Sequence, residues 1–114
     1  MWPLRSLLFV PAHRRDWVAK AIRQSPSAVV LDIEDSVPAE ERPRARGLLA
    51  EEIAELRDAA VGAVVRINPF GEDTGTEIAA ATVAGLTAVM LPKATTAAEV
   101  RAVHDLLSYH GRVA

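Results

Sequence analysis

The residue types best able to do chemistry occur at the ends of short apolar segments. Asp32, Glu34 and Asp35 follow one such segment within four positions, and Arg66 and Asn68 lie at the end of the next. Clustered carboxylates suit a hard divalent cation such as Mg²⁺, which prefers oxygen ligands. A planar guanidinium suits a carboxylate, which it can hold with two parallel hydrogen bonds. The pattern predicts a site for an anionic substrate supported by a metal ion.

A purely structural interpretation of these residues stays open. The carboxylates could form a salt bridge across neighbouring strands, with Asp35 or Ser36 capping a helix, because acidic loops before helices are common caps. Arg66 favours a functional role, since burial of an unpaired charge costs several kcal/mol. Lys93 could supply a counter-charge at the same place, or it could be solvated.

Weaker signals come from a second set of polar residues. Arg14 and Arg15 suit a phosphate-bearing ligand, although an exposed basic pair on a loop is the simpler interpretation, and His13 beside them is a lone histidine. The loop 69–75 lacks the spacing of dinucleotide and phosphate loops, so no nucleotide site is predicted. With 13 Lys and Arg against 15 Asp and Glu, the charge balance predicts no binding to nucleic acid or to an anionic membrane.

Strand-like and helix-like segments alternate four times along the chain. The predicted strands are Ser6–Val10, Ala28–Leu31, Ala63–Ile67 and Ala88–Leu91. Apolar residues with helical spacing follow each strand, at 18–22, 45–56, 78–83 and 100–107. This alternation predicts an α/β protein with a parallel sheet, either an open doubly wound sheet or part of a barrel. The carboxyl ends of parallel strands meet at one edge, so the candidate residues should converge there.

Helix ends are also marked in the sequence. Pro38 suits the first turn of the second helix, and Thr96 with Glu99 forms a capping box that opens the fourth. His110 and Gly111 predict a cationic last turn followed by a C-terminal glycine.

Length and composition limit the organisation to a single domain over residues 1–114. A closed barrel of eight βα units takes about 250 residues, so four units correspond to about half of one. The apolar segment before Pro11 is too short for a signal peptide, and no stretch approaches a membrane span. With no cysteine in the chain, we expect a cytoplasmic protein without disulfides or thiolate metal sites.

Five segments, in order, resemble the citrate lyase β-subunit-like proteins of the HpcH/HpaI aldolase superfamily. They are 5–12, 29–38, 45–46, 65–68 and 89–93. The resemblance implies a (β/α)₈ TIM barrel and a Mg²⁺-dependent carbon–carbon lyase. It further implies a CoA or acyl-carrier thioester substrate of the malyl, citramalyl or citryl type, and a homo-oligomer.

The same motifs imply roles for individual residues. Arg66 corresponds to the arginine that binds the substrate carboxylate, and Glu34 and Asp35 are the expected catalytic residues. The residues expected to bind substrate are Arg66, Asn68 and Lys93. Asp32, Glu34 and Asp35 are expected to act on the metal through water or hydrogen bonds, with no direct ligand in this chain.

Family members are more than twice as long, and their direct metal ligands come from later strands. We therefore expect a truncated member or a fragment whose open sheet favours self-association. Two alternatives remain. One is a non-catalytic half-barrel that acts as an interaction protein or is an inactive remnant. The other, a phosphoacceptor domain with Asp32 as acceptor, is disfavoured because residues 11–13 lack the acidic pair that such a site needs.

Overall fold

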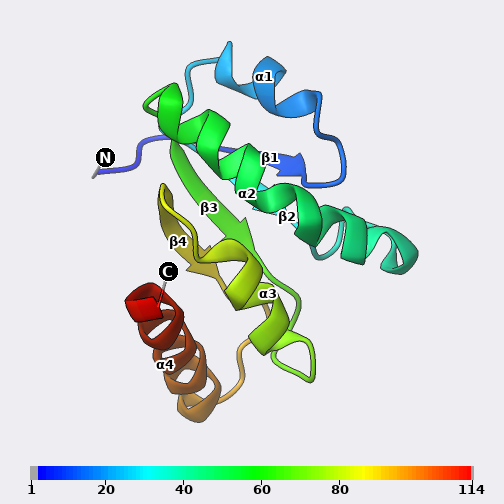
Figure 1. Cartoon of the computed structure of the whole chain (residues 1–114), viewed down its shortest axis with the longest axis vertical. Coiled ribbons are helices and arrows are strands. Elements are labelled where there is room, and N and C mark those ends of the chain that lie inside the picture. The colour runs from blue at the N-terminus through cyan, green and yellow to red at the C-terminus, as the bar shows by residue number, and fades with distance from the viewer. Residues whose placement is uncertain (1–2, 114) are drawn as a thin grey trace.

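Four parallel strands form one sheet in the order of the sequence, and each strand is followed by a helix (Figure 1). The computed structural model describes residues 3–113. The strands are β1 (Leu7–Pro11), β2 (Ala28–Asp32), β3 (Gly62–Arg66) and β4 (Leu86–Met90). The helices are α1 (Trp17–Ile22), the 3₁₀ helix η1 (Ala39–Glu41), α2 (Arg42–Asp58), α3 (Thr74–Ala81) and α4 (Ala97–Val113). The four predicted βα units are confirmed.

The main core lies between the sheet and the helices. Leu31 of β2 and Val65 of β3 are fully buried with Leu49, Ile53 and Leu56 of α2. Full burial of one such side chain contributes about 1.5–3 kcal/mol. The apolar stripe of α2 therefore holds the two central strands in place.

The other side of the sheet carries a small apolar cluster that no helix of residues 3–113 covers. Val30 and Val64 belong to this cluster, whose members in the described part of the chain are strand residues and Leu4. Side chains alternate along a strand, so Asp32 and Arg66 lie on the same side as these valines. We call this side the open face. It is apolar along its length and charged at the carboxyl edge.

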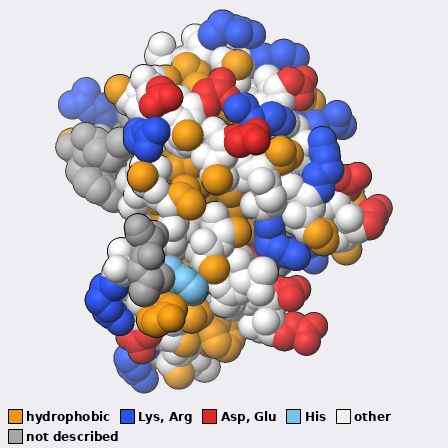
Figure 2. All heavy atoms as spheres, in the orientation of Figure 1, with side chains coloured by type: hydrophobic (Ala, Val, Ile, Leu, Met, Phe, Trp, Pro, Cys, Tyr) orange, Lys and Arg blue, Asp and Glu red, His pale blue; other side chains and the backbone are white. Residues whose placement is uncertain are grey.

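The central strand β2 is shielded from solvent, whereas the edge strand β1 is largely exposed. All of β2 is buried, whereas Leu7, Leu8 and Phe9 of β1 are exposed. On the helix-covered side, acidic and basic side chains are interspersed over α1 and α2 (Figure 2), as expected from the balanced composition. None of the helices in residues 3–113 is long and apolar enough to cross a membrane.

An irregularity in the last strand pair is explained by one hydroxyl. Ala63 pairs with Leu86 and Val64 with Ala88, so Thr87 is an extra residue in β4. The Ala63 N–H donates to the Thr87 hydroxyl at 3.1 Å. Thr87 thus replaces a ladder bond that the bulge would otherwise lose.

The predicted start of the second helix is wrong. Pro38 precedes η1, and α2 begins only at Arg42, with Pro43 in its first turn. The first turn of a helix has N–H groups without intrahelical acceptors, so either proline is tolerated there. Two prolines in one segment made the position ambiguous from sequence.

The fourth helix begins as predicted and ends later. Glu99 N–H donates to the Thr96 hydroxyl at 3.2 Å, and Thr96 N–H donates to the Glu99 carboxylate at 3.3 Å, which confirms the capping box. Gly111 does not end the helix, which continues to Val113. A C-terminal glycine needs a positive φ, and among the glycines of residues 3–113 only Gly85 has one.

Candidate active site

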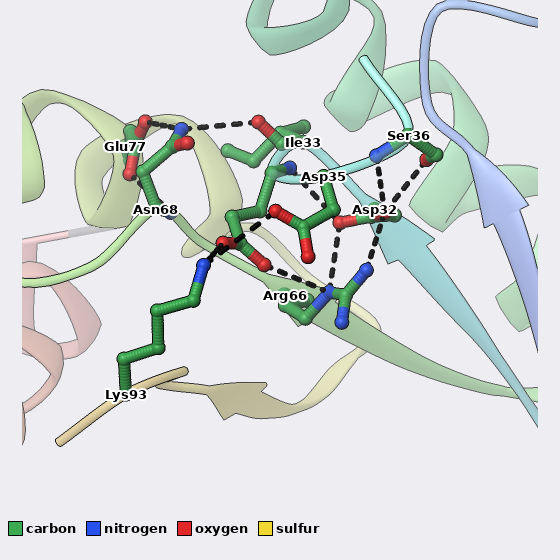
Figure 3. Close-up of polar contacts among 9 residues, drawn as sticks. Asp32, Ile33, Asp35, Ser36, Arg66, Asn68, Glu77 and Lys93 are labelled. Atoms are coloured by element: carbon green, nitrogen blue, oxygen red, sulfur yellow. Dashed lines mark hydrogen bonds and ion pairs between the residues drawn. The ribbon is translucent and has the colours of Figure 1, made fainter.

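The carboxyl ends of β2 and β3 place an aspartate and an arginine side by side. The register pairs Asp32 with Arg66. Arg66 Nε donates to Asp32 Oδ1 at 2.9 Å and Nη2 donates to Oδ2 at 2.7 Å (Figure 3). This two-bond geometry is among the strongest that charged side chains form. It fixes the guanidinium plane at the edge of the sheet.

Asp32 also organises the loop that follows it. Its carboxylate accepts hydrogen bonds from Glu34 N–H at 2.9 Å, from Ser36 N–H at 3.1 Å and from the Ser36 hydroxyl at 2.6 Å. Burial alone would raise the pKa of Asp32, but the donors of Arg66, Ser36 and the loop backbone lower it to about 2. The aspartate is therefore ionised at neutral pH and organises the loop after β2. The alternative in which Asp35 or Ser36 caps the next helix is wrong, because η1 and α2 have no side-chain cap.

Glu34 is a buried carboxylate between two cations. The residue is 2% exposed, and its Oε2 accepts a hydrogen bond from Lys93 Nζ at 2.6 Å. Its Oε1 lies 3.5 Å from Arg66 Nε and accepts no hydrogen bond within residues 3–113. Glu34 is thus a buried carboxylate whose second oxygen has only the ionic contact with Arg66 in this part of the chain.

Lys93 reaches the site from the loop after β4. Besides its bond to Glu34, its Nζ lies 3.6 Å from Asp35 Oδ1, and the contact with Glu34 raises the pKa of Lys93. The Asp35 side chain is 66% exposed and has no closer partner in the described residues. Of the two alternatives for Lys93, the structure shows the counter-charge, with the side chain still largely exposed, and Asp35 lies at the rim.

Asn68 is held apart from these charges. Its Nδ2 donates to Glu77 Oε2 at 2.6 Å and to the Ile33 carbonyl at 3.0 Å (Figure 3). Asn68 lies beyond the end of β3, and its side chain bridges α3 to the loop after β2. It therefore approaches the cluster through the Ile33 backbone rather than through Arg66.

Two residues of the site were missed from the sequence. The guanidinium of Arg66 lies over the ring of Phe9, with its central carbon 5.1 Å from the ring centroid. Strand alternation could have found Phe9, because it shares a side with Val30, its register partner. Glu77 lies in the first turn of α3, and nothing in its spacing links it to Asn68.

The basic residues after β1 form a separate group. Arg14 stacks on the ring of Trp17, and Arg15 pairs with Glu51 and Glu55 of α2. Arg14 and Arg15, with His13, line a cavity between the loop after β1 and the start of α2. The structure does not bring His13, Arg14 or Arg15 to the cluster around Arg66.

The geometry agrees with the comparison to known proteins. Residues 5–113 match HpcH/HpaI aldolase/citrate lyase. The chain belongs to this family. It is 38% identical to a citrate lyase subunit beta-like protein of Deinococcus radiodurans, over 91% of this chain and 38% of that protein. It is 32% identical to a (3S)-malyl-CoA thioesterase of Cereibacter sphaeroides, over 92% of this chain and 37% of that protein.

Solved structures of the HpcH/HpaI family share this fold. The citrate lyase beta subunit of Mycobacterium tuberculosis, complexed with oxaloacetate and magnesium, superposes with a TM-score of 0.67 at 37% identity. The match covers 85% of this chain and 42% of that one. CitE of the same organism, in complex with magnesium, acetoacetate and coenzyme A, superposes with a TM-score of 0.67 at 36% identity. This match covers 90% of this chain and 38% of that one. The predicted α/β barrel class is confirmed. The chain spans about two fifths of the length of these curated relatives.

Proposed function

We propose that this chain supplies the carboxylate-binding part of a Mg²⁺-dependent carbon–carbon lyase site. The substrate is a CoA or acyl-carrier thioester of a hydroxy-dicarboxylic acid of the malyl, citramalyl or citryl type. The observation that carries the proposal is Arg66, which is held at the carboxyl edge with part of its guanidinium unused. Relatives that bind oxaloacetate, magnesium and coenzyme A support it.

Arg66 is prepared for an anionic ligand. Asp32 occupies Nε and Nη2, and Phe9 lies against the guanidinium plane, so the side chain is already ordered. Nη1 makes no hydrogen bond within residues 3–113, although it carries two donors. A substrate carboxylate can bind there without first paying the entropy of ordering the arginine.

Magnesium fits this cluster as an ion held through water. Within residues 3–113, no three carboxylate or histidine side chains are grouped to bind a metal directly. Asp35, exposed at the rim, is the carboxylate that a metal-bound water would reach, and Glu34 would add negative charge behind it, because its Oε1 is buried. When bound, Mg²⁺ would supply positive charge where negative charge develops on the substrate.

The cleavage needs a proton acceptor. The hydroxyl loses its proton and becomes a carbonyl as the bond between its carbon and the α-carbon of the thioester breaks, and the electron pair left on the α-carbon later takes up a proton. We assign the first proton transfer to Asp35, whose side chain is exposed at the rim, with Glu34, whose Oε1 has no hydrogen bond in residues 3–113 but is buried, as the second candidate. Lys93 balances the charge of Glu34.

Binding of oxaloacetate in the presence of MgCl₂ tests the role of Arg66. Calorimetry on the purified chain should show binding, Arg66→Ala should weaken it at least about tenfold, and Arg66→Lys should not restore it, because a lysine lacks the planar fork. Arg101→Ala, on the exposed side of α4, is the matched control. Equal affinities for wild type and Arg66→Ala would refute the assignment.

Cleavage can be tested in a chimera. Residues 5–113 of this chain would replace the matching segment of the Deinococcus radiodurans relative. The chimera should release acetyl-CoA from malyl-CoA, and Arg66→Ala in it should abolish release. An active chimera that does not depend on Arg66 would contradict the proposal.

The open face favours a second candidate, a non-catalytic protein that associates with a second copy of itself. Val30, Val64, Ala88 and Met90 have no helix over them, and the edge strands β1 and β4 run in the same direction. The β1 strand of one copy can therefore continue the sheet beyond β4 of another. Light scattering should show a defined oligomer that Val64→Asp reduces to monomer, and turnover by the purified chain would reject a non-catalytic role.

A further inference from the structure

A buried carboxylate on α3 is committed entirely to Asn68. Glu77 is 1% exposed and forms no ion pair with any Lys, Arg or His in residues 3–113. Its Oε1 accepts the backbone N–H of Asn68 at 3.0 Å, and its Oε2 accepts Nδ2 at 2.6 Å (Figure 3). Burial of a charge without a counter-charge is costly. The role of Glu77 must therefore lie in these two bonds.

The orientation of the Asn68 amide follows from the contacts of its nitrogen. Nδ2 carries two hydrogens, of which one goes to Glu77 and the other to the Ile33 carbonyl at 3.0 Å. The oxygen Oδ1 accepts no hydrogen bond from the described residues and is not buried. The only polar atom that the Asn68 side chain can offer to a ligand is thus an acceptor.

We propose that Glu77 is a positioning residue that orients the Asn68 amide so that Oδ1 faces the ligand, and that the site consequently selects a hydroxy acid over the matching keto acid. The inference rests on the proposed function, in which the substrate carries a hydroxyl next to the bond that breaks. Ile33 lies between Asp32 and Glu34, so the same contact ties α3 to the charged cluster.

A carboxylate is required at position 77 because two donors of Asn68 converge on it. A glutamine has one acceptor and one donor group, so it can satisfy only one of the two N–H groups. In Glu77→Gln, either the Asn68 backbone N–H loses its acceptor or the amide rotates and presents Nδ2 in place of Oδ1. Both results weaken recognition of a hydroxyl.

Affinities for L-malate and oxaloacetate, each with MgCl₂, test the selection, because the two acids differ in the hydroxyl. Glu77→Gln and Asn68→Ala should each weaken L-malate binding about three- to tenfold and leave oxaloacetate binding nearly unchanged. The double variant should lose no more affinity for L-malate than Asn68→Ala alone. Glu72→Gln changes an exposed neighbour and should bind both acids as the wild type does. An equal loss for both acids in both single variants would overturn the selection.

Nuclear magnetic resonance tests the orientation without any ligand. The Asn68 side-chain N–H protons should exchange with solvent more slowly than those of exposed Gln24, and Glu77→Gln should remove the difference. If the Asn68 side-chain N–H protons of the wild type exchange as fast as those of Gln24, Glu77 does not hold the Asn68 amide in place. If the wild type binds neither acid, the proposed function fails for this chain and the exchange rates still decide the role of Glu77. Asn68→Ala keeps the affinity test decisive if Glu77→Gln does not fold.

Discussion

The buried carboxyl of Glu52 is the most informative place to perturb this fold. Glu52 lies on the core-facing side of α2, is 0% exposed, and has neither oxygen hydrogen-bonded within the described residues. Burial raises its pKa from 4.5 to about 8, and nearby Arg15 only partly opposes this effect. The folded protein therefore keeps this carboxyl protonated, whereas the unfolded chain ionises it at ordinary pH.

This difference in pKa between the folded and unfolded states sets the direction and the size of the effect of Glu52 on the free energy of unfolding. A carboxyl with a raised pKa has no effect on stability below pH 4.5, and stability is lost as the pH rises from there towards 8. Each pH unit in this window costs about 1.4 kcal/mol. At pH 7 the free energy of unfolding should be lower by about 3 kcal/mol than it would be with a neutral side chain. The free energy of unfolding of a whole protein is typically about 5–15 kcal/mol, so this is a large share of it.

Urea unfolding of wild type and Glu52→Gln, followed by circular dichroism between pH 5 and 8.5, measures this effect. Glutamine stays neutral, so the variant should be more stable than wild type by about 3 kcal/mol at pH 7, and the difference should shrink to about 1 kcal/mol at pH 5. Glu40→Gln, at an exposed position, is the control and should follow the wild-type curve. Parallel curves for wild type and Glu52→Gln would refute the reasoning.

Three further predictions concern the ends of strands and helices. Hydrogen bonds hold the pKa of Asp32 at about 2, below its ordinary 3.8. The stability that Asp32 provides is therefore present above pH 4 and is lost as the pH falls towards 2. In urea titrations, Asp32→Asn should be less stable than wild type at pH 7 and should not show this loss of stability in acid. Thr96→Ala removes a capping bond from α4 and should lower the free energy of unfolding by about 1 kcal/mol in the same assay. Gly85 has φ +104°, and an added Cβ would lie 3.0 Å from Arg57 Cβ. Gly85→Ala should therefore lower the thermal midpoint, with a cost above about 1 kcal/mol, and an unchanged midpoint would contradict the contact.

The elements of the fold were predictable because their signals are local. Apolar runs such as Ala28–Leu31 are too short for buried helices, and the Thr96 and Glu99 capping box acts within one helical turn. Boundaries that depend on a choice between similar residues were less secure. Pro38 and Pro43 both suit a helix start, and only the path of the chain through η1 selects the second.

The candidate site was predictable in position but not in its bonding. Parallel strands bring their carboxyl ends to one edge, so the acidic residues after β2 were expected to meet Arg66, and Lys93 could either join them or be solvated. The sequence does not say which of several carboxylates takes the arginine. The structure gives Asp32 to Arg66 and Glu34 to Lys93, because the register places Asp32 beside Arg66 and the loop turns Glu34 towards β4.

The sequence by itself determined the βα order, the side of the sheet that carries chemistry and the family, since these depend on periodicity and on motifs within short stretches of chain. Only the tertiary structure decided that Phe9 supports Arg66, that Glu77 holds Asn68 and that Glu52 is buried with no hydrogen bond to its carboxyl within residues 3–113. Each of these contacts depends on distances between separate elements, or on the direction in which a helix face is turned. Packing sets both quantities, and no spacing along the chain encodes them.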